Sequence, residues 1–294
     1  MDFTLSNASL TAAARTRGGE LTSLRDQTGT EYIWQGGPAF WSGQNPILFP
    51  IVGSLKDGKV NAGVQICKMG RHGFARQSEF TLTDQGQDFT VLELRESPET
   101  LAQFPFPFVL QVRHQLLENG FSTTFTVENP GPEPLPFCIG AHTAIRCPLF
   151  ANETFEDYEL TFDQPEDGDT LLLNAHGLLL DGETEPMLHS GKAALDYAVF
   201  RRLDTLIFQG LRSQRVSLRH KASGRGVSLD FRDFPMIAFW TKPSAPFLCM
   251  EPWHGCAACT GESGRFQDKP HVILLEPGEK KELGYQFHVL TDNG

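Results

Sequence analysis

Two ionisable residues stand in segments of the chain that are otherwise apolar. His142 interrupts a hydrophobic run over residues 135–149, and Glu251 ends another apolar run just before a Pro-Trp pair. A buried carboxylate must be paired, hydrogen-bonded or raised in pKa. A raised pKa suits a general base that works near neutrality, and a histidine can act as the matching acid. A hydrogen-bonded core histidine and a structural ion pair between Glu251 and an arginine are the alternatives.

A second histidine lies in the segment Gly-Arg-His-Gly-Phe-Ala-Arg over residues 70–76. His72 is flanked there by Arg71 and, four residues on, by Arg76. Gly73 has no Cβ, so it would let a ligand approach the backbone closely. An exposed loop with solvated arginines is the alternative interpretation of the same segment.

A pair of cysteines, Cys256 and Cys259, has the spacing of half a metal site or of a redox pair. A four-ligand zinc site needs a second pair of ligands, and no other Cys-x-x-Cys occurs in the sequence. Redox pairs of the thioredoxin kind precede a helix in an α/β unit, which this pattern is not. We therefore expect an incidental pair without zinc, and we expect no metal site or cofactor elsewhere in the chain.

Strand-like alternation surrounds these candidates. Apolar residues recur at every second position over residues 121–127, 227–231 and 283–289, as on the buried face of a strand. Helical periodicity is almost absent, and the best candidate is a short helix that begins at Ser97-Pro98. Many short strands predict an all-β fold, a large antiparallel β-sandwich, that forms one domain over residues 1–294. The turn-rich segment 129–134 is expected to be a hairpin loop.

The composition limits the classes of function. Hydrophobic residues make up 40% of the chain and charged residues 21%, and the formal net charge is −11. Such an acidic chain has no general attraction for nucleic acid or for an anionic membrane. The sequence shows neither a secretory signal nor an apolar run that would span a membrane. With six cysteines and no signal, we expect a cytoplasmic protein with reduced thiols. The oligomeric state is not predicted.

Five motifs, taken together and in order, resemble the aldose 1-epimerase (galactose mutarotase) family, and its LacX-like branch most closely. They span almost the whole chain: Phe49-Pro-Ile-Val-Gly53, His72-Gly-Phe-Ala-Arg76, Gly140-Ala-His142-Thr, Trp240-Thr-Lys-Pro and Glu251-Pro-Trp-x-Gly255. The resemblance implies a β-supersandwich with a sugar cleft on a concave sheet face. It implies an isomerase that opens and closes a hexose ring by acid–base catalysis and needs no cofactor.

The resemblance also implies roles for individual residues. His142 would protonate the ring oxygen, and Glu251 would take the proton from the anomeric hydroxyl, with the two groups on opposite sides of the sugar. His72 would support the ring oxygen, and Asp204 would bind a sugar hydroxyl.

Two tryptophans complete the expected sugar site. Trp240 and Trp253 would offer apolar faces to sugar C–H groups, and core packing is their alternative role. Asp204 has an alternative too, as an ordinary turn residue.

The chain departs from the family pattern at Ser54, where an arginine usually follows the glycine. Arg71 and Lys56 are the candidates to replace that arginine. The segment after Trp253 differs as well, which leaves the identity of the sugar open. Two other functions therefore stay in view. One is a hexose-6-phosphate epimerase that uses Arg71, Arg76 and Lys56 on the phosphate, and the other is a carbohydrate-binding protein without turnover.

Overall fold

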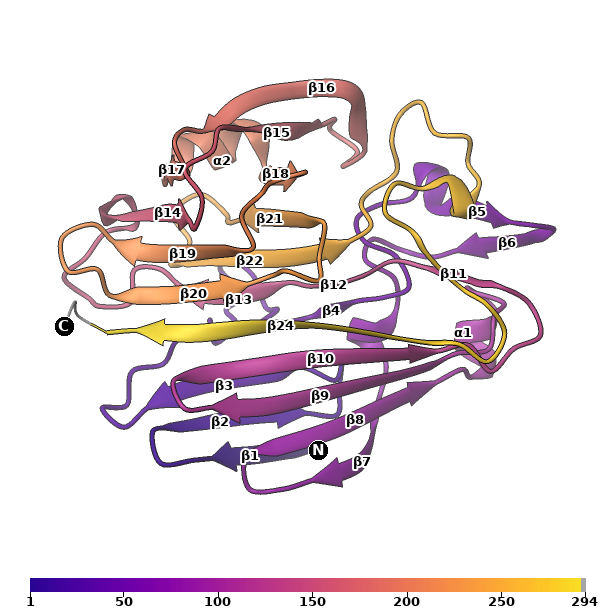
Figure 1. Ribbon diagram of the computed structural model, residues 1–294, viewed down its shortest axis with the longest axis horizontal. Helices are drawn as coiled ribbons and strands as arrows, with labels where there is room; N and C mark the ends of the chain where they lie inside the picture. Colours follow the sequence, from indigo (N-terminus) through magenta and orange to yellow (C-terminus); the bar gives the residue numbers. More distant parts are fainter. Residues whose placement is uncertain (292–294) are drawn as a thin grey trace.

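The computed structural model describes residues 1–291 of the chain. Antiparallel strands dominate it, and the largest sheet forms a broad layer across the molecule (Figure 1). Its last strand in sequence lies near the middle, between strands from two distant parts of the chain. The nine strands, in spatial order, are β17 (Lys192–Ala194), β14 (Tyr158–Phe162), β19 (Arg215–His220), β20 (Gly226–Asp230), β24 (Lys280–Leu290), β10 (Gly120–Glu128), β9 (Val109–Leu117), β8 (Phe89–Arg95) and β7 (Thr81–Gln85).

A six-stranded sheet forms the second layer, and its strands carry Trp240, Glu251 and Trp253 of the candidate site. Its path is β18 (Thr205–Gln209), β21 (Met236–Trp240), β22 (Phe247–His254), β12 (Ile139–Ala141) and β4 (Ile47–Leu48), and β13 (Thr143–Arg146) also pairs with β22.

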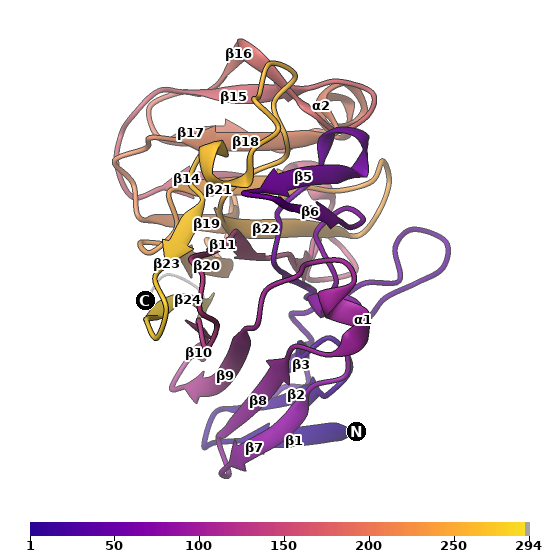
Figure 2. The ribbon, with the colours of Figure 1, turned by 90° about the vertical axis from the view of Figure 1, so that its right-hand side faces the viewer.

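The remaining strands form smaller sheets around these two layers. A three-stranded sheet of β1 (Asp2–Ser6), β2 (Leu10–Arg15) and β3 (Leu21–Asp26) lies at the end of the molecule opposite to β15 and β16 (Figure 2). The two-stranded pairs are β5 (Lys59–Ala62) with β6 (Gln65–Lys68), β11 (Leu135–Phe137) with β23 (Ile273–Leu275), and β15 (Gly168–Leu173) with β16 (Leu179–Leu188).

Aromatic side chains join the two large sheets. The ring centroid of Phe162 in β14 lies 5.9 Å from that of Phe208 in β18 and 6.1 Å from that of Phe239 in β21. Successive side chains of a strand point to opposite faces of the sheet. Because Phe208 and Phe239 point into the core, Ile207 and Trp240 point to the other face, and that face carries the pocket described below.

Two α-helices are short and capped by side chains. The helix α1 (Pro98–Leu101) begins where the sequence predicted it, with Ser97 and Thr100 bonded to each other's backbone in a capping box. The helix α2 (Tyr197–Leu203) is capped by Asp196, whose side chain accepts from the backbone N–H of Ala198.

The predicted all-β fold and its alternating strands are confirmed. In β10 the residues 121, 123, 125 and 127 are buried while 122, 124, 126 and 128 are partly exposed, and β24 repeats the pattern over residues 283–287. The hairpin predicted for residues 129–134 is wrong. This segment leads from β10 to β11, which pairs with β23 instead of β10. The loop therefore connects two sheets, because the strand after it finds its partner near the end of the chain.

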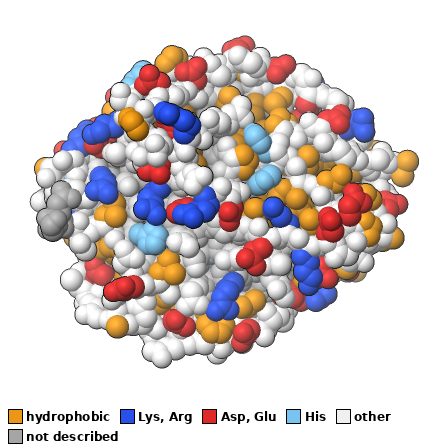
Figure 3. All heavy atoms as spheres, viewed as in Figure 1, with side chains coloured by type: hydrophobic (Ala, Val, Ile, Leu, Met, Phe, Trp, Pro, Cys, Tyr) orange, Lys and Arg blue, Asp and Glu red, His pale blue; other side chains and the backbone are white. Residues whose placement is uncertain are grey.

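Charges of both signs are interspersed on the surface. On the face seen in Figure 3, Lys and Arg side chains alternate with Asp and Glu and form no continuous basic area. Within residues 1–291, no helix is long and apolar enough to cross a membrane.

A buried histidine outside the pocket makes the stability of the fold sensitive to acid. His114 Nε2 donates to the carbonyl of Gly19, and Nδ1 accepts from the hydroxyl of Thr123, both at 2.9 Å. Burial lowers the pKa of His114 from 6.5 to about 4.

We expect the free energy of unfolding to fall as the pH drops from 6.5 to about 4, because the unfolded chain then binds a proton that folded His114 does not. This residue contributes up to about 3 kcal/mol to the loss. In the His114→Gln variant that part disappears, so the stability difference from wild type should shrink toward low pH. Urea unfolding across this range measures it, and a constant difference would contradict the expectation.

Candidate active site

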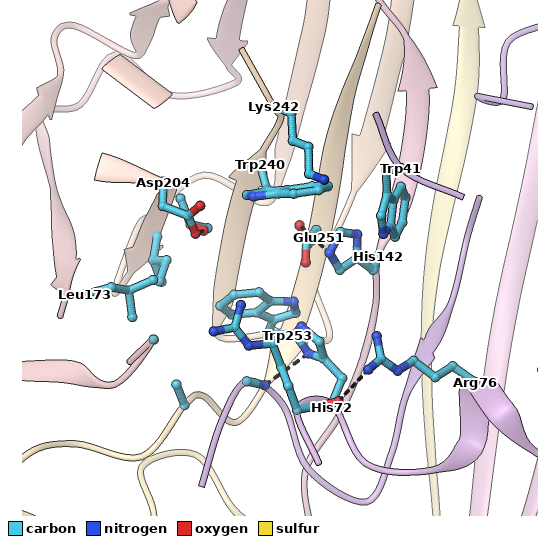
Figure 4. A pocket seen from close by; sticks show the side chains of 16 residues that line it. Trp41, His72, Arg76, His142, Leu173, Asp204, Trp240, Lys242, Glu251 and Trp253 are labelled. Atoms are coloured by element: carbon cyan, nitrogen blue, oxygen red, sulfur yellow. Dashed lines mark hydrogen bonds and ion pairs between the residues drawn. The ribbon is translucent and has the colours of Figure 1, made fainter. Parts of the chain in front are cut away.

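A pocket of about 230 Å³ opens on the outer face of the six-stranded sheet. Strands β18, β21 and β22 contribute Thr205, Ile207, Trp240, Glu251 and Trp253, and segments from several other parts of the chain complete the lining. Figure 4 shows ten of the lining side chains by name. All eight residues predicted for the site lie on it. The lining residues are Trp41, Gly53, Arg71, His72, Arg76, His142, Leu173, Gly177, Asp204, Thr205, Ile207, Trp240, Lys242, Glu251, Trp253 and Ala257.

Strand register brings His142 and Glu251 together. Gly140 of β12 pairs with Trp253 of β22, and Thr143 of β13 pairs with Met250 of β22. The same register places His142 directly opposite Glu251, and residues opposite each other on neighbouring strands share a face. The run 135–149 is not one strand, because its ladder is interrupted opposite Pro252, which has no N–H to donate.

The two side chains touch in a buried environment. His142 Nε2 lies 3.3 Å from Glu251 Oε1, and the glutamate side chain is 1% exposed. Neither oxygen of Glu251, nor Nδ1 of His142, has a hydrogen-bond partner within the described part of the chain. Burial raises the pKa of Glu251 well above 4.5, the indole N–H of Trp253 opposes that shift, and the charge of Asp204 adds to it.

Burial also lowers the pKa of His142, from 6.5 to about 3. Both shifts disfavour charge, so burial favours a neutral pair whose exchangeable proton is on Glu251. The expectation that the two groups face each other across the sugar is wrong. A gap of 3.3 Å between Nε2 and Oε1 leaves no room for a ring between them.

Three tryptophans wall the pair (Figure 4). Trp41 stacks on His142 with ring centroids 4.8 Å apart, and Trp240 meets the same imidazole edge-on at 5.5 Å. Trp253 lies on the other side of Glu251 and is 5% exposed. Sequence reasoning found Trp240 and Trp253 but missed Trp41, which belongs to a loop with no pattern of its own.

His72 is held by the backbone of the segment that precedes the pocket. The N–H of Gly53 donates to His72 Nδ1 at 3.1 Å, and the N–H of His72 donates to the carbonyl of Gly53 at 2.8 Å. Burial, followed by the charge of His142, keeps the pKa of His72 well below 6.5. Since Nδ1 accepts, the neutral ring carries its proton on Nε2 and is a hydrogen-bond donor.

Gly73 has a different role from the one expected. A Cβ on this residue would lie 2.2 Å from the carbonyl oxygen of Phe49. The close approach is therefore one between two segments of the chain.

Two arginines form one rim of the pocket. Arg71 Nε donates to Ser54 Oγ at 3.0 Å, so its guanidinium lies beside the position where the family pattern has an arginine. Arg76 donates to the carbonyl of Arg71 at 2.9 Å, and its Nε has no partner among residues 1–291. Lys56 donates to the carbonyl of Thr260 and is not part of the pocket lining. Of the two candidates to replace the missing arginine, the pocket contains Arg71.

Asp204 lies across the pocket from Trp41 (Figure 4). It ends α2 with a φ of 62°, a conformation that is uncommon for residues other than glycine. An unfavourable backbone that is kept at a pocket is typical of a functional position. Lys242 and Leu173 also line the pocket and were not predicted, although Lys242 belongs to the Trp240-Thr-Lys-Pro motif.

One group of potential metal ligands occurs in the described part of the chain. Ligand atoms of His142, Cys249 and Glu251 lie within 4.8 Å of one another. Burial raises the pKa of Cys249 well above 9.0, so its thiol stays protonated and is a poor ligand. Cys256 and Cys259 belong to no such group among residues 1–291.

Comparison with known proteins identifies the class. The aldose 1-epimerase family model matches residues 1–288, and the chain belongs to this family. The chromosomal LacX protein of Lactococcus lactis subsp. lactis is 36% identical over 304 residues, with 99% of this chain and 100% of that protein covered.

Two solved structures show the same galactose mutarotase-like fold. A galactose mutarotase related enzyme from Lactobacillus acidophilus has a TM-score of 0.93 at 28% identity, with 99% of this chain and 98% of that chain covered. A galactose mutarotase-like protein from Lactobacillus casei has a TM-score of 0.91 at 27% identity, with 99% and 100% covered.

The backbone at Asp204 gives a test of stored strain. Asp204→Gly and Asp204→Ala both remove the carboxylate, but only alanine keeps a Cβ at a φ of 62°. We expect the glycine variant to have a free energy of unfolding about 1 kcal/mol higher than the alanine variant. Denaturant unfolding of the two proteins measures this difference. Equal stabilities would mean that the backbone is not strained there.

Proposed function

We propose that this chain is an aldose 1-epimerase that interconverts the α and β anomers of a hexose by acid–base ring opening. The observation that carries the proposal is the buried contact between His142 and Glu251, in a pocket walled by tryptophans. Family membership and the mutarotase-related names of the structural relatives support a sugar as the substrate.

Mutarotation places a specific demand on the geometry of the catalytic groups. Ring opening removes a proton from the hydroxyl on C1 and adds one to the ring oxygen, which is bonded to the same carbon. The base and the acid must therefore lie side by side. His142 Nε2 and Glu251 Oε1, 3.3 Å apart on one sheet face, meet this demand.

The neutral pair also holds the correct number of protons. One exchangeable proton is shared by two groups, so the pair always contains one acid and one base. Transfer from Glu251 to His142 gives the form in which Glu251 accepts the C1 hydroxyl proton and His142 donates to the ring oxygen. After rotation about the C1–C2 bond the roles reverse and the ring closes on its other face. Each group is expected to contribute about 10²–10⁴-fold.

The other residues would bind and orient the sugar. His72 offers an Nε2–H donor to the region of the ring oxygen, and Asp204 offers a carboxylate to a hydroxyl on the opposite side. Trp240 and Trp253 offer apolar faces to the C–H groups of the ring. No cofactor takes part in the proposed reaction.

Substitution of the pair tests the assignment. Glu251→Gln removes the base and His142→Asn removes the acid, and both keep a polar side chain of similar size. Either change should lower kcat by about 10²-fold or more, because an interaction made in the transition state is lost. Anomer interconversion is followed by polarimetry, with the uncatalysed rate in the same buffer subtracted.

A buried carboxylate elsewhere provides the control for that test. Glu166 accepts from the backbone N–H groups of Arg212 and Ser213, both at 2.8 Å, and does not line the pocket. Glu166→Gln should retain a near-normal kcat. Near-normal rates in both pair variants, with an active wild type, would refute the assignment.

The pH dependence of kcat/KM follows from the pKa shifts. The pair is active while it holds one proton. A second proton is added only well below pH 6.5, because burial lowers the pKa of His142 to about 3. Burial also raises the pKa of Glu251, so the last proton leaves well above pH 4.5. We expect the acid limb of kcat/KM to lie well below pH 6.5 and the alkaline limb well above pH 4.5. An acid limb centred at 6.5 or higher would contradict this.

A phosphorylated hexose is the second candidate substrate. Arg71 and Arg76 share a pocket rim, no carboxylate of residues 1–291 lies within salt-bridge distance of either, and Arg76 Nε is buried without a partner. A phosphate would satisfy such donors.

Charge reversal at both arginines separates the two substrates. If the substrate carries a phosphate, the double variant with Arg71→Glu and Arg76→Glu should raise KM for the sugar phosphate at least about 10-fold more than for the free sugar. Arg17→Glu, an exposed position outside the pocket, is the matched control. Equal effects on both sugars would reject phosphate recognition.

A further inference from the structure

The orientation of the His142 imidazole depends on packing against other rings. Its Nε2 lies 3.3 Å from Glu251 Oε1, but its Nδ1 has no hydrogen-bond partner within residues 1–291. A catalytic histidine is usually oriented by a hydrogen bond to its second nitrogen, and that bond also sets which nitrogen carries the proton. Other contacts must therefore orient this ring.

Three rings surround the imidazole. The indole of Trp41 stacks on it, with centroids 4.8 Å apart and planes inclined by 30°. Trp240 and His72 lie nearly perpendicular to it, with centroids 5.5 Å and 5.6 Å away. A stacked ring at this distance opposes rotation of the imidazole about its Cβ–Cγ bond, because the turned ring would collide with it. Trp41 is thus the contact that holds the plane of His142.

The loop that carries Trp41 is fastened to the strand that follows His142. Ala144 of β13 accepts from the backbone N–H of Trp34 and donates to the carbonyl of Gln44, both at 2.9 Å. The loop therefore begins and ends on one residue of that strand. Inside the loop, the carbonyl of Trp41 accepts from the indole N–H of Trp34 at 2.8 Å.

Lys242 connects the same loop to the strand that carries Trp240. Its Nζ donates at 2.6 Å to the carbonyl of Phe40, the residue before Trp41. Figure 4 shows Lys242, Trp240 and Trp41 on the same side of the pocket. The ring of Trp41 also lies against Gly43, where a Cβ would come within 2.3 Å of it. Lys242 thus holds the backbone next to Trp41, although its position in the pocket lining suggests a substrate ligand.

We propose that Trp41 is a positioning residue that keeps the imidazole of His142 turned toward Glu251, and that Lys242 keeps Trp41 in place. The inference rests on the proposed function, in which His142 and Glu251 exchange one proton. An imidazole that turns away from Glu251 would interrupt this exchange. Trp41 acts through His142 in this role, so its loss should lower kcat more than it raises KM.

Substitutions in the loop separate positioning from direct contact with the sugar. Trp41→Ala should lower kcat by up to about 10²-fold, as small displacements of catalytic groups do, with a smaller change in KM. Trp41→Phe should restore most of kcat, because it keeps a ring that can stack on His142. Lys242→Met should lower kcat less than Trp41→Ala does, and Lys242→Arg, which keeps a donor, should lower it less again.

Phe40→Ala is the matched control for these variants. It removes an aromatic ring from the same loop, one that contacts Trp34 with centroids 6.5 Å apart, and it leaves the carbonyl to which Lys242 donates. Its kcat should stay near that of the wild type. An unchanged kcat with a raised KM in Trp41→Ala would overturn the proposal, because it would mean that Trp41 only binds the sugar.

The tautomer of His142 provides a second readout that needs no turnover. With the shared proton on Glu251, Nε2 of His142 accepts and the neutral ring carries its own proton on Nδ1. Side-chain nitrogen NMR of the wild type near neutral pH should show this single tautomer, and the signals of His142 are those missing from His142→Asn. In Trp41→Ala the freed ring should exchange between both tautomers. His114, whose two nitrogens are both hydrogen-bonded, should give the same signals in every variant.

The two readouts distinguish failure of the inference from failure of the proposed function. Unchanged His142 signals in Trp41→Ala would overturn the inference, whether or not the wild type is active. An inactive wild type would refute the proposed function, while the tautomer change would still decide whether Trp41 orients His142. Lys242→Met changes an exposed side chain and should shift the tautomers in the same direction to a smaller extent. It therefore gives the same test if Trp41→Ala does not fold.

Discussion

Burial determines the protonation of the contact between His142 and Glu251, because it lowers the pKa of the histidine and raises the pKa of the glutamate. An ion pair at this depth would lose the hydration of both charges, and a 3.3 Å contact in the interior repays that loss only with further hydrogen bonds. The remaining polar atoms of the pair lack such bonds in the described chain. The neutral form avoids the loss, so a single proton is left poised between two groups. The same low-polarity surroundings would strengthen the electrostatic interactions between the pair and a bound substrate.

The core fixes this contact from the opposite side of the sheet. Phe208 and Phe239 pack on Phe162 of the nine-stranded sheet, which sets the face on which their strand neighbours emerge. β22 is buried along almost its entire length, and its pairing with β21 and β13 leaves little freedom of register. A shift by one residue would turn Glu251 into the core. The precision of the site therefore comes from sheet packing, whereas its loops supply the walls.

The sequence predicted individual strands and helices better than it predicted the contacts between them. Alternation at residues 121–127 and the cap at Ser97 are local signals, and both were read correctly. Apolar surroundings marked His142 and Glu251 as unusual, but their register joins residues more than a hundred positions apart. The hairpin prediction for residues 129–134 was wrong for the same reason, because turn residues do not determine with which strand the next strand pairs. Trp41 and the positive φ of Asp204 depend on tertiary contacts and carry no local pattern.

The proposed reaction needs proton-transfer groups at fixed positions and, at the same time, free rotation of part of the substrate. Proton transfer needs donors and acceptors held at fixed positions, and the sheet provides these through His142 and Glu251. The open-chain aldehyde must instead rotate about its C1–C2 bond before the ring closes on the other face. Directional hydrogen bonds to C1 from several sides would oppose that rotation. Trp41, Trp240 and Trp253 line the pocket around the pair, and their apolar rings would contact a rotating group without holding it in one orientation. Asp204 and Arg71 also line the pocket, where they would hold the rest of the sugar in the proposed reaction.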